Sequence, residues 1–175
     1  LDQRTGAVVW SVQAERWEEG FSITSAPLYY DGRVITGFAG AEFGIRGRVK
    51  AYDADDGKLL WTFYTIPGPG EPGHDTWPQD NDVWQHGGAS VWQTPAVDPE
   101  LGLLYFSTGN PGPDFYSAIR PGANLYAGSV IVLDAKTGTY RAHYEIVPAD
   151  YHDWDVSATP VVTTTRGGKK QVLIA

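Results

Sequence analysis

The sequence predicts an all-β fold, a β-propeller built from four-stranded antiparallel blades. Three observations predict this fold: a turn unit that recurs along the chain, a second hairpin type that alternates with it, and the absence of long helical periodicity. The 21 glycines and 12 prolines are spread over all 175 residues, as expected for many turns between short strands.

The recurring turn unit has the pattern apolar–Asp–x–x–x–Gly–x–x–x–aromatic. The Asp side chain can accept hydrogen bonds from backbone N–H groups of the turn, and the Gly can adopt a positive φ. The aromatic residue then lies in the return strand, where it can pack against the neighbouring blade. The unit occurs at Asp2–Gly6 with Trp10, at Asp53–Gly57 with Trp61, more loosely at Asp98–Gly102 with Phe106, and at Asp134–Gly138 with Ala142 in the aromatic position. Successive units are 51, 45 and 36 residues apart, near the roughly 40–50 residues of a blade.

The second hairpin type opens with a small residue and a proline. An Asp31-Gly32 pair between two apolar runs is a strong signal for a tight hairpin turn. Proline is tolerated at the start of a strand, where its missing N–H does no harm. Three segments begin in this way, at Ala26-Pro27, Thr94-Pro95 and Thr159-Pro160.

The polar, Pro/Gly-rich segment 67–86 is expected to form one long loop, and long loops in compact folds are often functional. A β-sandwich is the alternative fold for many short strands. The spacing of the units and the alternation of two hairpin types favour the propeller.

Charge and composition exclude several classes of function. The net charge of −8 argues against nucleic acid or an anionic membrane as the main partner, because their phosphates would be repelled. The sequence has no apolar run long enough to span a bilayer, and no cysteine for disulfide or thiolate chemistry. The chain opens inside a repeat-like unit and ends in a predicted strand, so we expect an internal part of a longer protein.

Three segments resemble the PQQ-dependent (quinoprotein) methanol/ethanol dehydrogenase family, in the order that the family has them. They are GAEFGIRGRVKAYDADDGKLLWTFYTIPGPG at 40–70, GGASVWQTPAVDPELGLLYFSTGNPGP at 87–113 and PADYHDWDVSATP at 148–160. The resemblance implies an eight-bladed propeller of W-shaped sheets. Residues 1–175 would then form one partial propeller domain, about half of the ring, with no second domain.

The resemblance assigns metal ligands to residues that would otherwise appear ordinary. From the residues alone, Glu42 is a solvated turn residue and Asn110 belongs to an Asx turn before a proline. In the family these positions bind the metal, and oxygen donors suit Ca²⁺ or a lanthanide ion.

The resemblance also assigns residues to the binding of pyrroloquinoline quinone (PQQ). Trp92 would ordinarily be placed in the core, but it matches the tryptophan whose ring lies flat under the quinone. Ser90 and Thr24 match hydroxyl residues that hydrogen-bond the cofactor. Gly40 and Ala41 match positions where the backbone approaches the quinone closely.

The catalytic base is expected in the acidic segment DYHDWD, which from the residues alone is a solvated loop. Aligned without a gap from Pro148, Asp153 is the general base and Asp155 an additional metal ligand, as in the lanthanide-using branch. We prefer this alignment because it needs no gap from Pro148 and keeps Asp150 aligned as well. In a strand-like stretch both carboxylates would also point to one side and could bind one cation. A two-residue slip makes Asp155 the base, followed by Ser157, and favours Ca²⁺.

The resemblance implies an oxidoreductase that oxidises a small, for example primary, alcohol. The metal would act as a Lewis acid, the Asp would remove the hydroxyl proton, and electrons would pass to a cytochrome c. The family's usual compartment is the periplasm, and membrane association would need parts outside this chain. The main alternative is a non-catalytic propeller scaffold or assembly factor, which would not need Glu42, Asn110 and DYHDWD together. A glycoside-acting propeller with paired carboxylates would not need Trp92.

Overall fold

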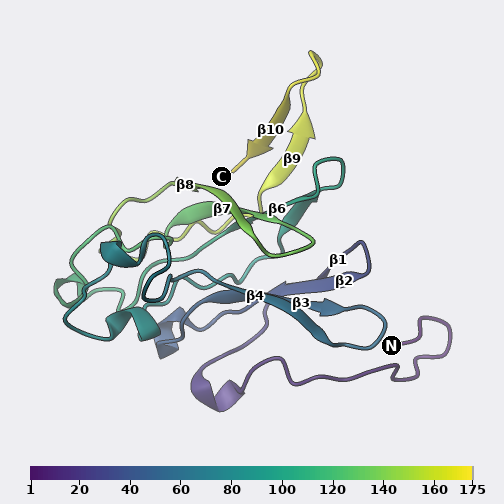
Figure 1. Cartoon of the computed structure of the whole chain (residues 1–175), viewed down its shortest axis with the longest axis horizontal. Coiled ribbons are helices and arrows are strands. Elements are labelled where there is room, and N and C mark those ends of the chain that lie inside the picture. The colour runs from purple at the N-terminus through teal and green to yellow at the C-terminus, as the bar shows by residue number, and fades with distance from the viewer. Residues whose placement is uncertain (175) are drawn as a thin grey trace.

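The computed structural model describes residues 1–174, which form two four-stranded antiparallel sheets and one further hairpin (Figure 1). The first sheet has the order β1 (Leu28–Tyr30), β2 (Arg33–Gly37), β3 (Arg48–Asp53), β4 (Leu59–Tyr64). The second sheet has the order β5 (Ala96–Asp98), β6 (Leu103–Ser107), β7 (Ser129–Asp134), β8 (Tyr140–Glu145). The hairpin pairs β9 (Val161–Thr164) with β10 (Lys170–Leu173). The predicted four-stranded antiparallel blades are thus confirmed, while the share of an eight-bladed ring that the chain fills stays a prediction.

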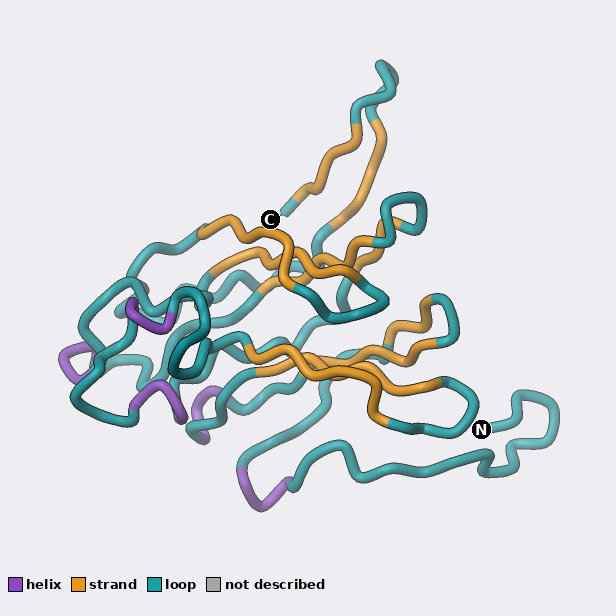
Figure 2. Tube along the Cα trace, viewed as in Figure 1, coloured by secondary structure: helices purple, strands orange, loops and turns teal. Residues whose placement is uncertain are grey.

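Helical structure within residues 1–174 is limited to short 3₁₀ turns, and none of them has the length and apolar character of a membrane span. They are η1 (Trp17–Glu19), η2 (Ala41–Phe43), η3 (His74–Thr76), η4 (Val83–His86) and η5 (Ser117–Ile119). Figure 2 shows most of them among the long loops at one end of the two sheets, opposite the tight hairpin turns.

The turn unit behaves as its chemistry predicts. The Asp53 carboxylate accepts a hydrogen bond from the Asp55 N–H at 2.8 Å, and Gly57 has a φ of 77°. The other three glycines of the unit also have a positive φ, at Gly6, Gly102 and Gly138. The corresponding Asp side chains each accept backbone N–H groups of their own turns, at Asp2, Asp98 and Asp134.

One copy of the unit has a different place in its blade than predicted. The turns at Asp53–Gly57 and Asp134–Gly138 join the third and fourth strands of their sheets, whereas Asp98–Gly102 joins β5 to β6, the first and second. The sequence pattern reports the local hydrogen bonds of a turn, which are alike in both places. It therefore does not distinguish the two positions, and the predicted spacings of 45 and 36 residues do not measure one blade.

The aromatic residue of the unit packs against the next blade, as predicted. A Cβ atom added to Gly57 would lie 2.7 Å from the Trp10 ring, and one added to Gly138 would lie 2.6 Å from the Trp61 ring. Trp10 lies before the first sheet and Trp61 in its β4, so each indole covers the turn glycine of the sheet that follows. These glycines are needed both for the positive φ and for the close approach of an indole ring.

The main core lies between the two sheets. Its buried residues come from both, and the Phe63 and Phe106 rings meet edge to face at 6.3 Å. Segment 67–86 has a smaller core of its own, in which Trp77 and Val83 pack on Ile66, Ala89 and Ala127. The long loop is thereby a packed part of the molecule.

Candidate active site

The loops that carry the predicted site residues are joined by backbone hydrogen bonds, although they lie far apart in the sequence. The Val91 N–H donates to the Phe38 carbonyl at 2.9 Å, and the Gly109 N–H donates to the Ser90 carbonyl at 2.9 Å. The Ala89 N–H donates to the Asn110 carbonyl at 2.9 Å. The loops with Phe38 and Gly109 follow β2 and β6, and the segment with Ser90 and Val91 lies between η4 and β5, so the fold brings the three segments to one place.

Gly109 is the point at which three predicted residues meet. A Cβ atom there would lie 2.7 Å from Asp155 Oδ1, 3.4 Å from Ser90 Oγ and 3.4 Å from Trp92 Nε1. The Asn110 N–H donates to Asp155 Oδ1 at 2.8 Å. The structure therefore brings a carboxylate, a hydroxyl and an indole edge together around a position where only glycine fits without a shift.

Trp92 is partly exposed, so its place differs from that of a core tryptophan. Its backbone carbonyl accepts a hydrogen bond from Thr24 Oγ1 at 3.0 Å, which connects Thr24 to the same loop. Ser90 is buried, whereas Thr24 is exposed. An indole held at its backbone and partly open to solvent is able to stack on a planar group.

Gly40 and Ala41 have close neighbours within the chain itself. Gly40 has a φ of 132°, and a Cβ there would lie 2.1 Å from the Gly20 carbonyl oxygen. Ala41 is buried, with its Cβ 3.1 Å from the place of a Cβ on Gly88. The small size of both residues thus already has a packing reason, apart from any contact with a quinone.

The acidic residues of the site influence one another electrostatically. Partial burial of the carboxyl raises the pKa of Asp155, and the negative charges of Asp153, Glu42 and Asp150 raise it further, although its own hydrogen bond from Asn110 opposes this. Burial also raises the pKa of Asp114, with the charges of Asp153 and Glu42 acting in the same direction. Glu42 and Asp153 are therefore near enough to Asp155 and Asp114 to act on them electrostatically.

Asp114 is a member of this region that the sequence analysis missed. Its carboxylate accepts a hydrogen bond from Asn110 Nδ2, while Asn110 itself is buried. Among the hydrogen bonds of residues 1–174, none is donated to Asn110 Oδ1, so this oxygen keeps its capacity as an acceptor or a ligand.

The described residues do not form a finished metal site. Within residues 1–174, no group of three or more His, Asp or Glu side chains is arranged to hold a metal ion. The predicted ligands are nevertheless hard oxygen donors of the type that Ca²⁺ and lanthanides take. The donor chemistry fits a cation, while the side chains stand farther apart than ligands would.

The expectation of a strand-like stretch around Asp153 and Asp155 is wrong. Asp153 has a φ of 61° and lies in an irregular loop, in the left-handed region that a strand residue does not adopt. The buried Asp150 side chain folds this loop back on itself, because it accepts the N–H groups of His152 and Trp154 at 2.8 and 2.9 Å. Asp153 and Asp155 are both exposed, but the Asp155 carboxylate accepts the Asn110 N–H, whereas no hydrogen bond among residues 1–174 is donated to the Asp153 side chain.

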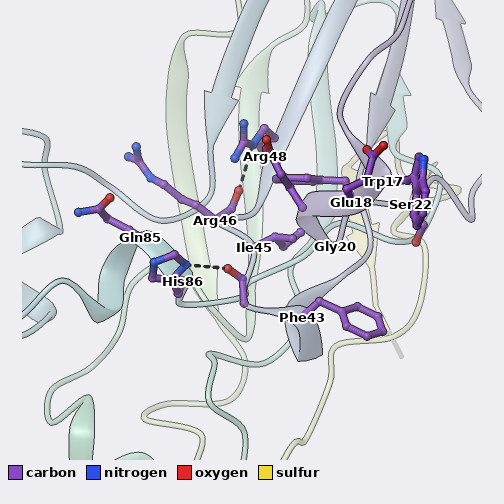
Figure 3. Close-up of a pocket in the computed structure, with 13 residues that line it drawn as sticks. Trp17, Glu18, Gly20, Ser22, Phe43, Ile45, Arg46, Arg48, Gln85 and His86 are labelled. Atoms are coloured by element: carbon purple, nitrogen blue, oxygen red, sulfur yellow. Dashed lines mark hydrogen bonds between the residues drawn. The ribbon is translucent and has the colours of Figure 1, made fainter.

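Two cavities lie near these residues. A cavity of about 390 Å³ is lined by Glu42 and Asp114 and by apolar residues such as Val83 and Ile119. A larger cleft of about 960 Å³ lies on the other side of η2, between Trp17, Phe43, Arg48 and His86 (Figure 3). The larger cleft is lined by none of the predicted site residues, so cavity size and the resemblance indicate different places.

Comparison with known proteins identifies the family. The model of the PQQ family, described as glucose/ethanol/alcohol dehydrogenase, beta-propeller domain, matches residues 3–175. The quinohemoprotein alcohol dehydrogenase ADH IIB of Pseudomonas putida is 43% identical over 93% of this chain and 25% of its own length. The quinoprotein alcohol dehydrogenase PedH of Pseudomonas putida is 38% identical over 100% of this chain and 32% of its own length.

A solved structure has the same architecture. A europium-containing methanol dehydrogenase superposes with a TM-score of 0.88 at 31% sequence identity, over 99% of this chain and 33% of its own. The chain thus spans about a quarter to a third of the length of these relatives. The family model covers nearly all of the residues, and the blades superpose on those of the methanol dehydrogenase. The chain therefore belongs to the PQQ-dependent quinoprotein alcohol dehydrogenase family of β-propellers.

Proposed function

We propose that the full-length protein is an alcohol dehydrogenase that binds PQQ and a metal ion in the region around Gly109 and oxidises a small alcohol. The observation that carries this proposal is the meeting of Asp155, Ser90 and Trp92 at Gly109. This arrangement puts a proton acceptor, a hydroxyl group and a partly exposed indole within reach of one bound molecule. A glycine at the centre leaves room that any other residue would fill.

Different predicted site residues would bind PQQ and the cation, according to the chemistry of their side chains. The Trp92 indole would support one face of the planar cofactor, and the hydroxyl groups of Ser90 and Thr24 would hydrogen-bond its edge. Gly40 and Ala41 would allow the backbone to come close. Glu42, Asn110 Oδ1 and one or both of Asp153 and Asp155 would hold the cation. When bound, the quinone would accept a hydride and the cation would polarise a quinone carbonyl.

The geometry favours Asp155 as the general base. Its carboxylate accepts the Asn110 N–H and lies near the Trp92 edge at Gly109, whereas the Asp153 side chain accepts no hydrogen bond among residues 1–174. A base must lie within hydrogen-bond reach of the alcohol hydroxyl whose proton it accepts, and the Asp155 carboxylate lies at Gly109 beside Trp92, the predicted cofactor floor. The slipped alignment, with Ser157 following the base, is therefore the one that we adopt.

The choice of metal and electron acceptor goes beyond these residues. In the slipped alignment Ser157 offers a neutral oxygen, which suits Ca²⁺, whereas carboxylates at both 153 and 155 would suit a trivalent ion better. One related enzyme contains europium, so both metals belong in the test. The quinohemoprotein names of relatives support a haem-based acceptor, for which we propose a cytochrome c, and we propose the periplasm as the compartment.

The test is reconstitution of the full-length protein with PQQ and either Ca²⁺ or La³⁺, followed by dye-linked oxidation of a series of primary alcohols. We expect alcohol-dependent dye reduction that requires both the quinone and a metal. Trp92→Ala should lower quinone content and turnover without changing the circular dichroism spectrum, because stacking contributes about 1 kcal/mol beyond area burial. A correctly folded protein that binds no quinone would instead favour the scaffold alternative.

A further inference from the structure

Asp150 organises the loop that carries the proposed base. It is 2% exposed, and its two carboxylate oxygens accept different backbone N–H groups, Oδ1 that of His152 and Oδ2 that of Trp154. A carboxylate that accepts two backbone donors within four residues holds the chain in one conformation. The Asp155 carboxyl follows directly after this turn, so its direction depends on the turn.

Arg120 connects this loop to the loop that carries Asn110. It is 2% exposed, and three of its four hydrogen-bond acceptors are backbone carbonyls. Its guanidinium donates to the Asp150 carbonyl at 2.7 Å, to the Pro113 carbonyl at 3.0 Å and to the Asp114 carbonyl at 3.1 Å. The fourth acceptor is Asn124 Oδ1 at 3.1 Å. The planar fork of an arginine can hold two loops in a fixed relation, which the single ammonium group of lysine cannot do.

We propose that Arg120 and Asp150 are positioning residues that fix the Asp155 carboxylate against the Asn110 loop. Arg120 holds residues 113, 114 and 150 together, Asp150 orders residues 151–154, and the bond from the Asn110 N–H to Asp155 Oδ1 at 2.8 Å closes the connection. The catalytic consequence rests on the proposed function, in which Asp155 is the base. The structural consequence, a coupled pair of loops, stands independently of it.

The experiment uses Arg120→Lys and Asp150→Asn in the full-length protein. Arg120→Lys keeps the charge but loses the fork, and Asp150→Asn leaves one acceptor oxygen for two donors. Hydrogen exchange followed by mass spectrometry should become faster in the peptides that hold Asn110 and residues 151–155. In the loaded enzyme we expect kcat to fall about 10- to 100-fold while the alcohol KM and the quinone content change by less than about twofold.

Matched controls separate positioning from general loss of stability. Asp134→Asn neutralises the same kind of turn carboxylate at the β7–β8 hairpin, and Arg48→Lys removes an arginine fork in β3 that bonds Glu15 and, within residues 1–174, makes no bond to either loop. In both control variants, hydrogen exchange in the peptide that holds Asn110 should stay at the wild-type rate, and kcat should also be unchanged. Wild-type exchange and wild-type kcat in Arg120→Lys and Asp150→Asn would overturn the inference.

If one of the two variants folds poorly, the other still tests the proposal, because Arg120→Lys and Asp150→Asn weaken different parts of the hydrogen-bonded connection. The variant that folds normally is then the one whose exchange and kcat are compared with the wild type. If the full-length protein oxidises no alcohol at all, the proposed function fails. The exchange measurement then still tests the coupling of the two loops.

Discussion

Gly109 has no side chain, and the position of the Asp155 carboxylate depends on that absence. We expect Gly109→Ala to displace Asp155, because the new Cβ would lie 2.7 Å from its Oδ1. A misplacement of the base of about 1 Å corresponds to a loss of turnover of about 100-fold. Steady-state kinetics of the full-length enzyme measures this loss. Gly167→Ala is the control, because its nearest neighbour is the Thr165 hydroxyl at 3.9 Å, and activity retained in Gly109→Ala would remove Gly109 from the site.

The two candidate bases give opposite results when each is neutralised. Asp155→Asn should lower kcat by about 100-fold or more with either Ca²⁺ or La³⁺, because the amide cannot accept the alcohol proton. Asp153→Asn should retain turnover with at least one of the two metals. Single-turnover reduction of the bound quinone by alcohol measures the chemical step directly. The reverse pattern would restore the ungapped alignment from Pro148, with Asp153 as the base.

At the scale of elements, the Lys170 ammonium group joins the β9–β10 hairpin to the second sheet, where β9 also lies against β5. Lys170 Nζ lies 2.6 Å from an oxygen of the buried Asp98 and 3.0 Å from Glu100 Oε2. The hydrogen bond from Lys170 lowers the pKa of Asp98 below its ordinary 3.8, and the same bond raises the pKa of Lys170 above its ordinary 10.5. Asp98 is also the Asx-turn residue of the β5–β6 hairpin, so one side chain serves a local and a long-range role.

This attachment gives the hairpin a defined pH range. The contribution of Asp98 is fully present above pH 3.8 and is lost as the pH falls through its lowered pKa. The contribution of Lys170 is fully present below pH 10.5 and is lost as the pH rises through its raised pKa. We therefore expect Lys170→Met to lower the unfolding midpoint between these limits and to match the wild type in strong acid. Lys169→Met, at an exposed neighbour, is the control, and an equal effect of both variants would contradict the role of the ion pair.

Across the whole molecule, tryptophans join consecutive blades. The Trp61 ring lies over Gly138 of the second sheet in the same manner as Trp10 lies over Gly57 of the first. We expect Trp61→Ala to lower the free energy of unfolding by about 3 kcal/mol, because it removes a large packed side chain from the junction of two blades. Leu60→Ala on the same strand, 41% exposed, should have a smaller effect. Urea unfolding of the full-length protein measures the difference, and equal losses would show that the blade junction does not depend on the indole.

The fold could be predicted from the sequence because its signals are local. An Asp that accepts N–H groups of its own turn, a glycine with positive φ, and an Asp31-Gly32 hairpin all act within a few residues, so their patterns are visible in the chain. The place of Asp98–Gly102 within its blade could not be predicted in this way. The local bonds of a turn are the same wherever in the sheet it lies.

The site residues were named from the sequence, but their arrangement was decided by the tertiary structure. Glu42, Ser90, Trp92, Asn110 and the DYHDWD segment are all predictable as a set from the resemblance. The direction of the Asp155 carboxylate depends on the turn that Asp150 forms. That turn is hydrogen-bonded to Arg120, which lies 30 positions before Asp150 and which no local pattern marks. Asp114 was missed for the same reason, because its role arises from a side-chain contact with Asn110. The sequence alone thus determined a bladed β-fold and the side chains available to it, and long-range hydrogen bonds decided which carboxylate lies beside the Asn110 loop.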